Sequence, residues 1–177
     1  SRSSAASDVY KRQLQNCALS DNGGTTTVDG GAIYAQGGDV TLGLTEMYRN
    51  RAALAGADGG AVVASVIHTD QSDFHDNSAS VHGGALLAGT LDLKNSWFTD
   101  NAATGGPGDT YGGAVWGNDV SILHSEFDGN KADGGGAVGA VDGSIVIASS
   151  SFFGNGLDTG FGGAIRNVSG QVDLYKT

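Results

Sequence analysis

Carboxylates are the most numerous side chains in this sequence that could do chemistry. The 177 residues include 17 aspartates and two glutamates, and Asp70, Asp73 and Asp76 lie close together in the chain. Hydrolysis by two carboxylates needs acids held at a set separation across one bond. No Asp-Asp pair occurs, and these three aspartates lie around a repeat turn, where aspartate is common for conformational reasons. We therefore predict no catalytic residues.

Histidines and the remaining aspartates could instead bind a metal ion. The four histidines would form a site only if the fold brought them together, and we interpret them as solvated turn residues: His68, His75, His82 and His124. Calcium suits aspartates and backbone carbonyls at turns. Asp76 and Asp100 each precede an asparagine at equivalent positions, which makes them weak candidates for calcium, the only cofactor considered. The single cysteine, Cys17, excludes an intramolecular disulfide and a cysteine zinc site.

A repeat of about 27 residues must position these side chains. The triplet Gly-Gly-Ala occurs six times, with its alanine at Ala32, Ala61, Ala85, Ala114, Ala137 and Ala164. A second motif, a bulky residue three positions before an asparagine, alternates with the triplet. Its copies run from Leu19 to Asn22, Met47 to Asn50, Phe74 to Asn77, Phe98 to Asn101, Phe127 to Asn130 and Phe152 to Asn155. Two motifs that keep one irregular period indicate a repeat architecture.

Short stretches of alternating apolar residues follow each Gly-Gly-Ala. An aliphatic residue comes directly after the alanine, and a second alternating stretch starts six or eight residues after it. Period-two alternation broken by glycine, asparagine and aspartate predicts strands, and no sustained 3.6-residue period predicts a helix. A hydroxyl residue lies two positions before the bulky residue, at Thr45, Ser72, Ser96, Ser125 and Ser150, with Cys17 in the first copy.

Units of about three short strands cannot bury an apolar face alone, so they must stack on one another. The sequence therefore predicts an all-β fold, a parallel β-helix (solenoid) of about six coils of 23–29 residues. We expect each asparagine to occupy a left-handed bend and to link neighbouring coils through its amide. The glycine pair should make the next bend, where a Cβ would clash or φ must be positive. The predicted structural ladders are Asn22, Asn50, Asn77, Asn101, Asn130 and Asn155; Phe74, Phe98, Phe127 and Phe152; and Gly31, Gly60, Gly84, Gly113, Gly136 and Gly163.

The residue two positions after each alanine is predicted to face outward. The six positions are Tyr34, Val63, Leu87, Trp116, Gly139 and Arg166. Large apolar side chains on the flank of a rod can mark a surface for a protein or glycan partner. We predict such a surface from Trp116, Tyr34, Leu87 and Tyr111, with Trp116 beside the long loop that ends at Tyr111 as its centre. The alternative is that neighbouring loops cover these residues, or that surface strands simply favour such residue types.

Composition narrows the functional classes and the domain organisation. A net charge of −10 repels phosphate backbones and anionic lipid, so no nucleic-acid partner is expected. No apolar run reaches 18 residues, so we predict no membrane insertion by this segment. Residues 1–13 differ from the repeats and are predicted to be a non-native, adapter-derived leader, which leaves 14–177 as one repeat domain truncated at both ends. Open coil ends invite end-to-end self-association.

The repeats resemble those of the chlamydial polymorphic outer membrane proteins. The resemblance lies in Gly-Gly-Ala-Ile at residues 30–33 and 162–165 and in the four Phe-x-x-Asn copies. Met47 and Leu19 depart from the strict pattern, as do the Val and Leu residues that often follow the alanine. The resemblance implies a right-handed, pectin-lyase-like β-helix in an exported passenger region. It also implies extracellular or outer-membrane-associated display, an often adhesive role, and a cell-surface protein or glycan as partner.

Several functions are compatible with these observations. The leading hypothesis is a non-enzymatic, surface-displayed segment that is adhesive or structural. The alternative is a glycan-binding β-helix, or a polysaccharide lyase or glycoside hydrolase on the same fold. An enzyme would bring carboxylates and a lysine or arginine into one cleft, but the sequence lacks the Asn-x-Asp, Asp-Asp, Gly-His-Gly and Arg-x-Lys motifs of polygalacturonase-type hydrolases. Ice binding would need a regular threonine array, which Thr41 and Thr69 do not continue.

Overall fold

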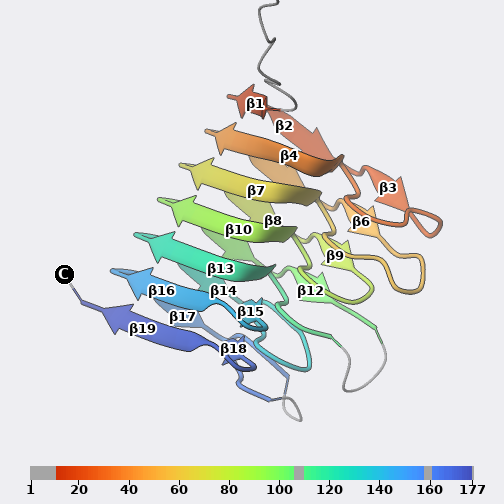
Figure 1. The fold of residues 1–177 in the computed structure, drawn as a ribbon. Coiled ribbons are helices and arrows are strands. Elements are labelled where there is room, and N and C mark those ends of the chain that lie inside the picture. Colours follow the sequence, from red (N-terminus) through yellow and green to blue (C-terminus); the bar gives the residue numbers. More distant parts are fainter. Residues whose placement is uncertain (1–10, 106–109, 158–160, 177) are drawn as a thin grey trace, which may run out of the picture.

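The chain winds into a stack of β-coils. The computed structural model describes residues 11–105, 110–157 and 161–176. All strand pairs within these ranges are parallel, and the strands build a β-solenoid of about six turns (Figure 1). No helix occurs in the described part of the chain, so no helix there is long and apolar enough to cross a membrane. The all-β, parallel β-helix architecture predicted from the repeat is confirmed.

Each coil adds strands to as many as three parallel sheets. The nine-stranded first sheet contains β1 (Lys11–Gln15), β4 (Ile33–Gly43), β7 (Val62–Asp70), β10 (Leu86–Lys94), β13 (Val115–Leu123), β15 (Val138–Ala140), β16 (Ser144–Ala148), β18 (Ile165–Asn167) and β19 (Gln171–Tyr175). The six-stranded second sheet contains β2 (Ala18–Ser20), β5 (Glu46–Tyr48), β8 (Asp73–His75), β11 (Trp97–Thr99), β14 (Glu126–Asp128) and β17 (Ser151–Phe153). The four-stranded third sheet contains β3 (Gly23–Gly24), β6 (Arg51–Ala52), β9 (Ser78–Ala79) and β12 (Ala102–Ala103).

The first sheet begins earlier than the repeat domain expected from the sequence. Residues 11–13, the end of the predicted leader, pair with residues 39–41 of β4. Residues 1–10, the rest of that predicted leader, lie outside the described residues. Among the described residues, β1 thus extends the first sheet to Lys11, three residues before Leu14.

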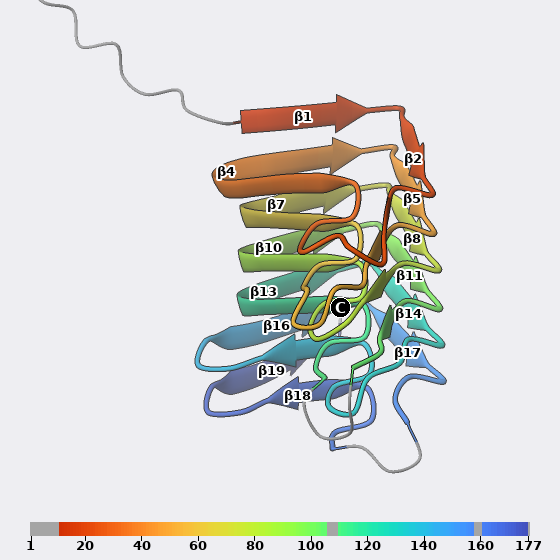
Figure 2. The same cartoon turned by 90° about the vertical axis from the view of Figure 1, so that its right-hand side faces the viewer.

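The long strands of the first sheet join the two apolar stretches that the sequence separates. Strand β10, for example, runs without a break from the residue after the alanine to the end of the second stretch. These strands curve strongly in their middle (Figure 2), and the pairing of β10 with both neighbours skips Gly89. In the next coil but one the two stretches remain separate as β15 and β16. The curvature lets both halves of one strand face the same interior.

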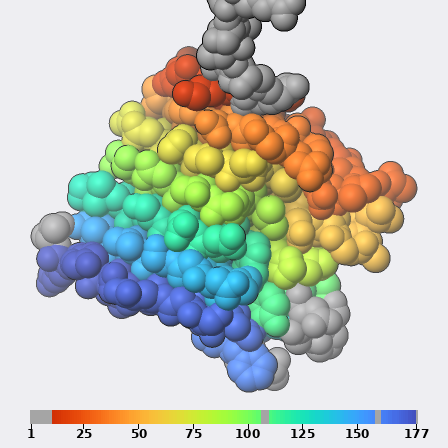
Figure 3. All heavy atoms as spheres, viewed as in Figure 1, coloured from red at the N-terminus to blue at the C-terminus, as the bar shows by residue number. Residues whose placement is uncertain are grey.

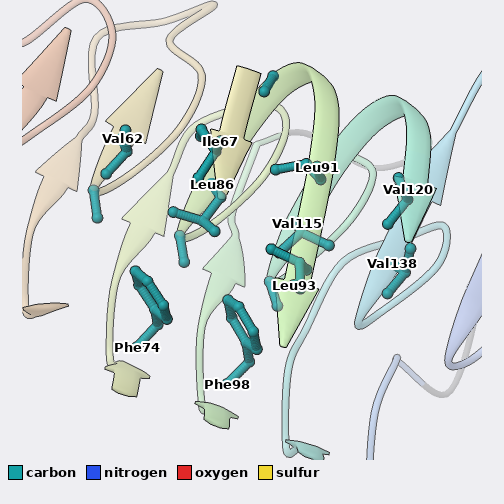
Figure 4. Close-up of a cluster of buried hydrophobic side chains, with 14 of the residues drawn as sticks. Val62, Ile67, Phe74, Leu86, Leu91, Leu93, Phe98, Val115, Val120 and Val138 are labelled. Atoms are coloured by element: carbon teal, nitrogen blue, oxygen red, sulfur yellow. The ribbon is translucent and has the colours of Figure 1, made fainter. Parts of the chain in front are cut away.

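The interior is built from columns of like residues. The bulky column of the second sheet stacks ring on ring, with 4.8 Å between the Phe74 and Phe98 centroids and 4.6 Å between those of Phe98 and Phe127. Figure 4 shows Phe74 and Phe98 side by side, with aliphatic residues such as Leu91 and Leu93 from the first sheet around them. Phe74, Phe98 and Phe127 are fully buried. The register thus places equivalent positions of successive coils in direct contact.

The asparagine column forms a continuous hydrogen-bonded ladder. Asn77 Nδ2 donates to Asn101 Oδ1 at 3.0 Å and to the Met47 carbonyl oxygen at 2.8 Å. Asn77 Oδ1 accepts bonds from the backbone N–H and the Nδ2 of Asn50, each at 3.0 Å. The side-chain pairing extends from Asn22 to Asn155. Each interior asparagine therefore links three coils, and within the described ranges no buried side-chain nitrogen or oxygen lacks a partner.

The left-handed bend next to this ladder is one residue earlier than predicted. Positive φ angles occur at Asp21, Arg49, Asp76, Asp100, Gly129 and Gly154, each directly before an asparagine. The interior asparagines have ordinary backbone and point their amides into the stack, so the preceding residue must turn the chain. A second corner has positive φ directly before each hydroxyl residue, and before Cys17 in the first copy, at Asn16, Leu44, Gln71, Asn95, His124 and Ser149.

The hydroxyl column is a second ladder, for which the sequence suggested no role. The Ser72 hydroxyl donates to the Asp70 carbonyl oxygen at 3.0 Å and accepts the Thr45 backbone N–H at 3.2 Å.

The glycine pairs make the remaining bend. The first glycine of each pair has positive φ, whereas a Cβ on the second, for example Gly84, would collide with the backbone of Gly113 in the next coil. The bends of each coil are thus fixed by backbone geometry, and the outer side chains are free to vary.

Outer surfaces combine residues from equivalent positions of successive coils. Figure 3 shows the coils as parallel bands of colour across the face of the first sheet, each band lying against the next. Side chains that are neighbours on this surface are therefore about one repeat apart in the sequence.

Candidate functional site

The outer face of the second sheet gathers aromatic and charged side chains, and we call it the second-sheet face. Its strands are three residues long, and the middle residue of each points into the core. The flanking residues therefore point outward and form two columns along these strands, and Figure 2 shows the strands running down one side of the rod. The first column contains Glu46, Asp73, Trp97, Glu126 and Ser151, and the second contains Tyr48, His75, Thr99, Asp128 and Phe153.

Trp97 is the most exposed large side chain in the middle of this face. Its exposed fraction is 48%. Asp73 and Glu126 are its register partners on the two adjacent strands, β8 and β14. No ring of the described residues stacks on the indole. The arrangement is an open aromatic surface with a carboxylate on either side.

A cluster of histidine and carboxylates lies beside Trp97 on the same face. The ligand atoms of Glu46, Asp73 and His75 all lie within 4.8 Å of one another. His75 Nε2 is 3.3 Å from Glu46 Oε1, and His75 Nδ1 is 3.0 Å from Asp76 Oδ2. The imidazole stacks on Tyr48 with 5.0 Å between ring centroids and 2° between ring planes. The histidine is thus held by ring stacking and by a carboxylate at each nitrogen.

The electrostatics of this cluster follow from burial and from these neighbours. Burial raises the pKa of Asp73, and the nearby Glu46 carboxylate adds to this effect. Burial alone would lower the pKa of His75, but hydrogen bonds from its ring to Asp76 and Glu46, together with the charges of Asp73 and Asp76, raise that pKa above its ordinary value. The shift of the His75 pKa shows that the surrounding carboxylates favour its charged form, whereas the shift of the Asp73 pKa mainly reflects the loss of solvent around that carboxyl.

The predicted partner surface around Trp116 has a different character. The indole stacks on His82 at 4.8 Å and on Tyr111 at 5.3 Å between centroids. The Arg166 guanidinium lies 4.4 Å from the Tyr111 ring centroid, and a Cβ on Gly139 would collide with the indole of Trp116. The ring faces of Trp116 and Tyr111 are therefore used for packing within the chain.

The other positions that were predicted to face outward differ in exposure. Tyr34 is 46% exposed and its hydroxyl bonds Gln36, whereas Leu87 is half-buried. Val63, which was predicted to face outward, is buried. Its side chain lies against Gly59 of the same coil, where a Cβ would contact Val63 Cγ2. The structure thus brings Trp116 and Tyr111 together with His82, and it places Tyr34 on β4, three strands away from Trp116 on β13.

A shallow depression of about 310 Å³ lies on the first sheet. Its lining includes His68, Asp70, Asp92 and Lys94. Lys94 Nζ pairs with Asp92 at 2.9 Å, and Asp92 also lies 3.4 Å from His68 Nδ1. Carboxylates and a lysine therefore do meet in one hollow, which is the arrangement that the enzyme alternative requires.

Of the three aspartates that are near in sequence, Asp70 lies apart from the other two. Asp70 ends β7 on the first sheet, where its carboxylate accepts a bond from Asn95 Nδ2 at 2.7 Å. Asp73 and Asp76 follow the corner at Gln71 and belong to the second-sheet face. Asp76 bonds His75, and no metal-ligating group of three or more described residues includes Asp76 or the other calcium candidate, Asp100.

The two threonines considered for ice binding are not equivalent in the structure. Thr41 is exposed and pairs in register with His68, while Thr69 is buried and bonds Ser96.

Sequence reasoning overlooked Trp97 and Glu46. Each directly precedes the bulky residue of its strand, at Phe98 and Met47, so period-two alternation alone predicts that both face outward.

Comparison of this chain with protein-family models, curated protein sequences and solved structures finds no match.

Proposed function

We propose that this protein is a non-enzymatic, surface-displayed β-solenoid that binds carbohydrate on its second-sheet face. A solenoid whose interior is complete coil by coil can project a long, rigid surface and leave the outer columns free for recognition. The outer columns of the second sheet hold the open aromatic ring and the carboxylates that such recognition uses.

The exposed indole of Trp97 is the observation that carries this proposal. A sugar ring presents aliphatic C–H groups that pack on an aromatic face, while its hydroxyls need acceptors at the edge. Trp97 is half exposed and unstacked among the described rings, and Asp73 and Glu126 are its register partners. These three residues supply both kinds of contact.

The charge of the face selects the kind of glycan. Asp73 and Glu126 flank the indole, and Asp128 lies next to Glu126 in the second outer column. Arg49, an arginine beside this face, is already paired with Asp21 at 2.9 Å. Carboxylates repel uronic acids and sulfates, so the ligand is a neutral or amine-bearing glycan.

A binding assay with defined oligosaccharides tests the proposal. We expect the full chain to bind neutral or amine-bearing hexasaccharides, such as cellohexaose or chitosan hexamer, more tightly than heparin. Trp97→Ala should weaken this binding by about tenfold or more, since loss of one aromatic contact removes on the order of 1–2 kcal/mol. Trp116→Ala, which removes the other tryptophan, is the matched control and should leave binding unchanged.

Two results would oppose the proposal. One is equal glycan affinity in wild type and Trp97→Ala. The other is loss of binding in Trp116→Ala with unchanged folding, which would transfer the role to the surface predicted from the sequence. Circular dichroism of both variants establishes that the solenoid is intact.

The cellular setting of this proposal comes from the repeat resemblance. Six Gly-Gly-Ala triplets and the Phe-x-x-Asn copies support an exported, cell-surface segment of the polymorphic outer membrane protein type, with a right-handed, pectin-lyase-like helix. Surface labelling of cells that produce the protein, with and without protease treatment from outside, tests this location. A signal that survives external protease would contradict display.

The first-sheet depression supports a second candidate, a polysaccharide-acting enzyme. Asp70, Asp92 and Lys94 line one hollow there. This candidate predicts release of reducing or unsaturated ends from a polysaccharide by the wild type, and loss of that activity in Lys94→Ala. Absence of activity on neutral and acidic polysaccharides alike would leave the binding function as the better account.

A further inference from the structure

We propose that Glu46, Asp73 and His75 form a binding site for a divalent transition-metal ion, with zinc as the preferred metal. The three residues come from adjacent strands β5 and β8, and their ligand atoms lie within 4.8 Å of one another. The inference rests on this geometry alone and does not depend on glycan binding, although Asp73 belongs to both surfaces.

The orientation of His75 is the first argument. Its Nδ1 lies 3.0 Å from Asp76 Oδ2, so this nitrogen carries the proton that the carboxylate accepts. Nε2 lies 3.3 Å from Glu46 Oε1, so a metal ion bound between these two atoms would take the place of a proton shared by them. A carboxylate on the nitrogen that does not bind the metal is the arrangement that orients metal-binding histidines in proteins.

The spacing of the ligand atoms is the second argument. A tetrahedral zinc ion with ligands at about 2.0–2.1 Å holds neighbouring ligand atoms roughly 3.3 Å apart. The 3.3 Å between His75 Nε2 and Glu46 Oε1 matches that edge. Glu46 is half exposed, with 50% of its side-chain surface accessible, so it can adjust to close the remaining distance to Asp73.

Rigidity on the histidine side is the third argument. The imidazole lies parallel to the Tyr48 ring, and only 29% of its side-chain surface is accessible. One fixed nitrogen ligand and two carboxylates suit zinc, because calcium requires six to eight oxygen ligands. Three protein ligands leave one tetrahedral position for water.

The other two histidine–carboxylate pairs of the described chain lack this arrangement. His68 contacts Asp92, but Lys94 Nζ already supplies a positive charge to that carboxylate at 2.9 Å. His82 contacts Asp58 at 2.9 Å and is stacked between aromatic neighbours. Neither pair belongs to a group of three metal-ligating residues among the described positions, so His68 provides a matched control.

Calorimetric titration of the chelator-treated full chain with zinc chloride tests the inference. We expect one saturable site per chain and a rise in the melting temperature with zinc, because a ligand that binds only the folded state stabilises it. His75→Gln should lower the affinity about 100-fold or more, and Asp76→Asn about 10–100-fold, because the carboxylate that orients the metal-binding histidine is lost. His68→Gln and Trp97→Ala should bind zinc as the wild type does.

A second measurement identifies the ligand atom directly. In nitrogen-15 spectra of histidine-labelled protein, zinc should shift the Nε2 signal of one histidine, and that signal should be missing in His75→Gln. If His75→Gln does not fold, Glu46→Gln, at a more exposed position, replaces it with an expected loss of about tenfold or more in affinity.

Two outcomes would overturn the site. One is zinc affinity that is equal in wild type, His75→Gln and Glu46→Gln, or zinc binding that is lost only in His68→Gln. The other is calcium binding as tight as zinc binding and insensitive to His75→Gln, which would show general attraction of cations to an acidic surface. Unchanged zinc binding in Trp97→Ala separates failure of the glycan proposal from failure of the metal site.

Discussion

The two faces of the second sheet differ in how much their residues change from one coil to the next. Along the inner face, one type of side chain recurs from coil to coil: Leu19, Met47, Phe74, Phe98, Phe127 and Phe152. Along the outer face, the residue directly before each of these changes with every coil: Ala18, Glu46, Asp73, Trp97, Glu126 and Ser151. Stacking demands like shapes inside, where each ring packs on the next, and demands nothing comparable outside. The repeated inner residues therefore reflect the demands of stability, whereas the outer residues vary without disturbing the stack.

The two tryptophans express the same difference. Trp116 is half-buried and packs on His82 and Tyr111, while Trp97 is half exposed on the outer column. An aromatic side chain with both neighbours stacked contributes to the free energy of unfolding, whereas an open one contributes little to it and leaves its ring accessible to a ligand. Sequence position within the repeat, rather than residue type, decides which role applies.

The largest difference in stability is expected between variants of two adjacent residues that lie on opposite faces of the second sheet. Phe98→Ala should lower the free energy of unfolding by about 3–5 kcal/mol, because it removes a fully buried ring from the middle of a stack. Trp97→Ala should lower it by less than about 0.5 kcal/mol, as for an exposed surface position. Urea unfolding followed by far-ultraviolet circular dichroism measures both values. Similar losses of unfolding free energy in the two variants would contradict the difference between the inner and outer faces.

A smaller effect is expected at the other tryptophan. Trp116→Ala should lower the free energy of unfolding by about 1–3 kcal/mol, since two stacked pairs are lost and each contributes roughly 0.5–1.5 kcal/mol beyond area burial. Trp116→Phe keeps part of the stack and should recover about half of the loss. The same urea titration measures these values. A change as small as that of Trp97→Ala would mean that the stack on Trp116 contributes nothing to folding.

Substitutions in the last coil are expected to change the free energy of unfolding least, but to change assembly visibly. There the interior columns are open: Leu174 is 68% exposed, Val172 is 40% exposed, and a cavity of about 560 Å³ lies beside Phe152 and Ile165. Apolar surface of this kind at an open sheet edge favours association. We predict that the 177-residue chain self-associates end to end, and that Leu174→Lys shifts it toward monomer.

Light scattering coupled to size-exclusion chromatography, over a range of concentrations, checks this prediction. Leu44→Lys, which changes an exposed leucine at a corner away from that coil, is the control and should not alter assembly. A wild-type chain that stays monomeric at all concentrations would contradict end-to-end association.

Part of the site could be read from the sequence and part could not. Alternation predicts that Glu46, Asp73, Trp97 and His75 face outward, because each neighbours a bulky buried position. It does not predict that Glu46 and His75, 29 residues apart, meet at 3.3 Å. That distance depends on side-chain orientation, which Tyr48 and Asp76 impose from two directions.

The sequence by itself determined the architecture. Two motifs that share one period force equivalent residues of a parallel stack into contact, and this identifies the asparagine and phenylalanine columns before any coordinates are known. The sequence also located the bend at each glycine pair, but the tertiary structure alone decided where the chain turns at the other two corners. The corner at Gln71 separates Asp70 from Asp73, and the bends precede the asparagines instead of including them. Backbone dihedrals at single residues set these directions, and a repeat pattern fixes which residues stack but not the angle at which the chain leaves each stack.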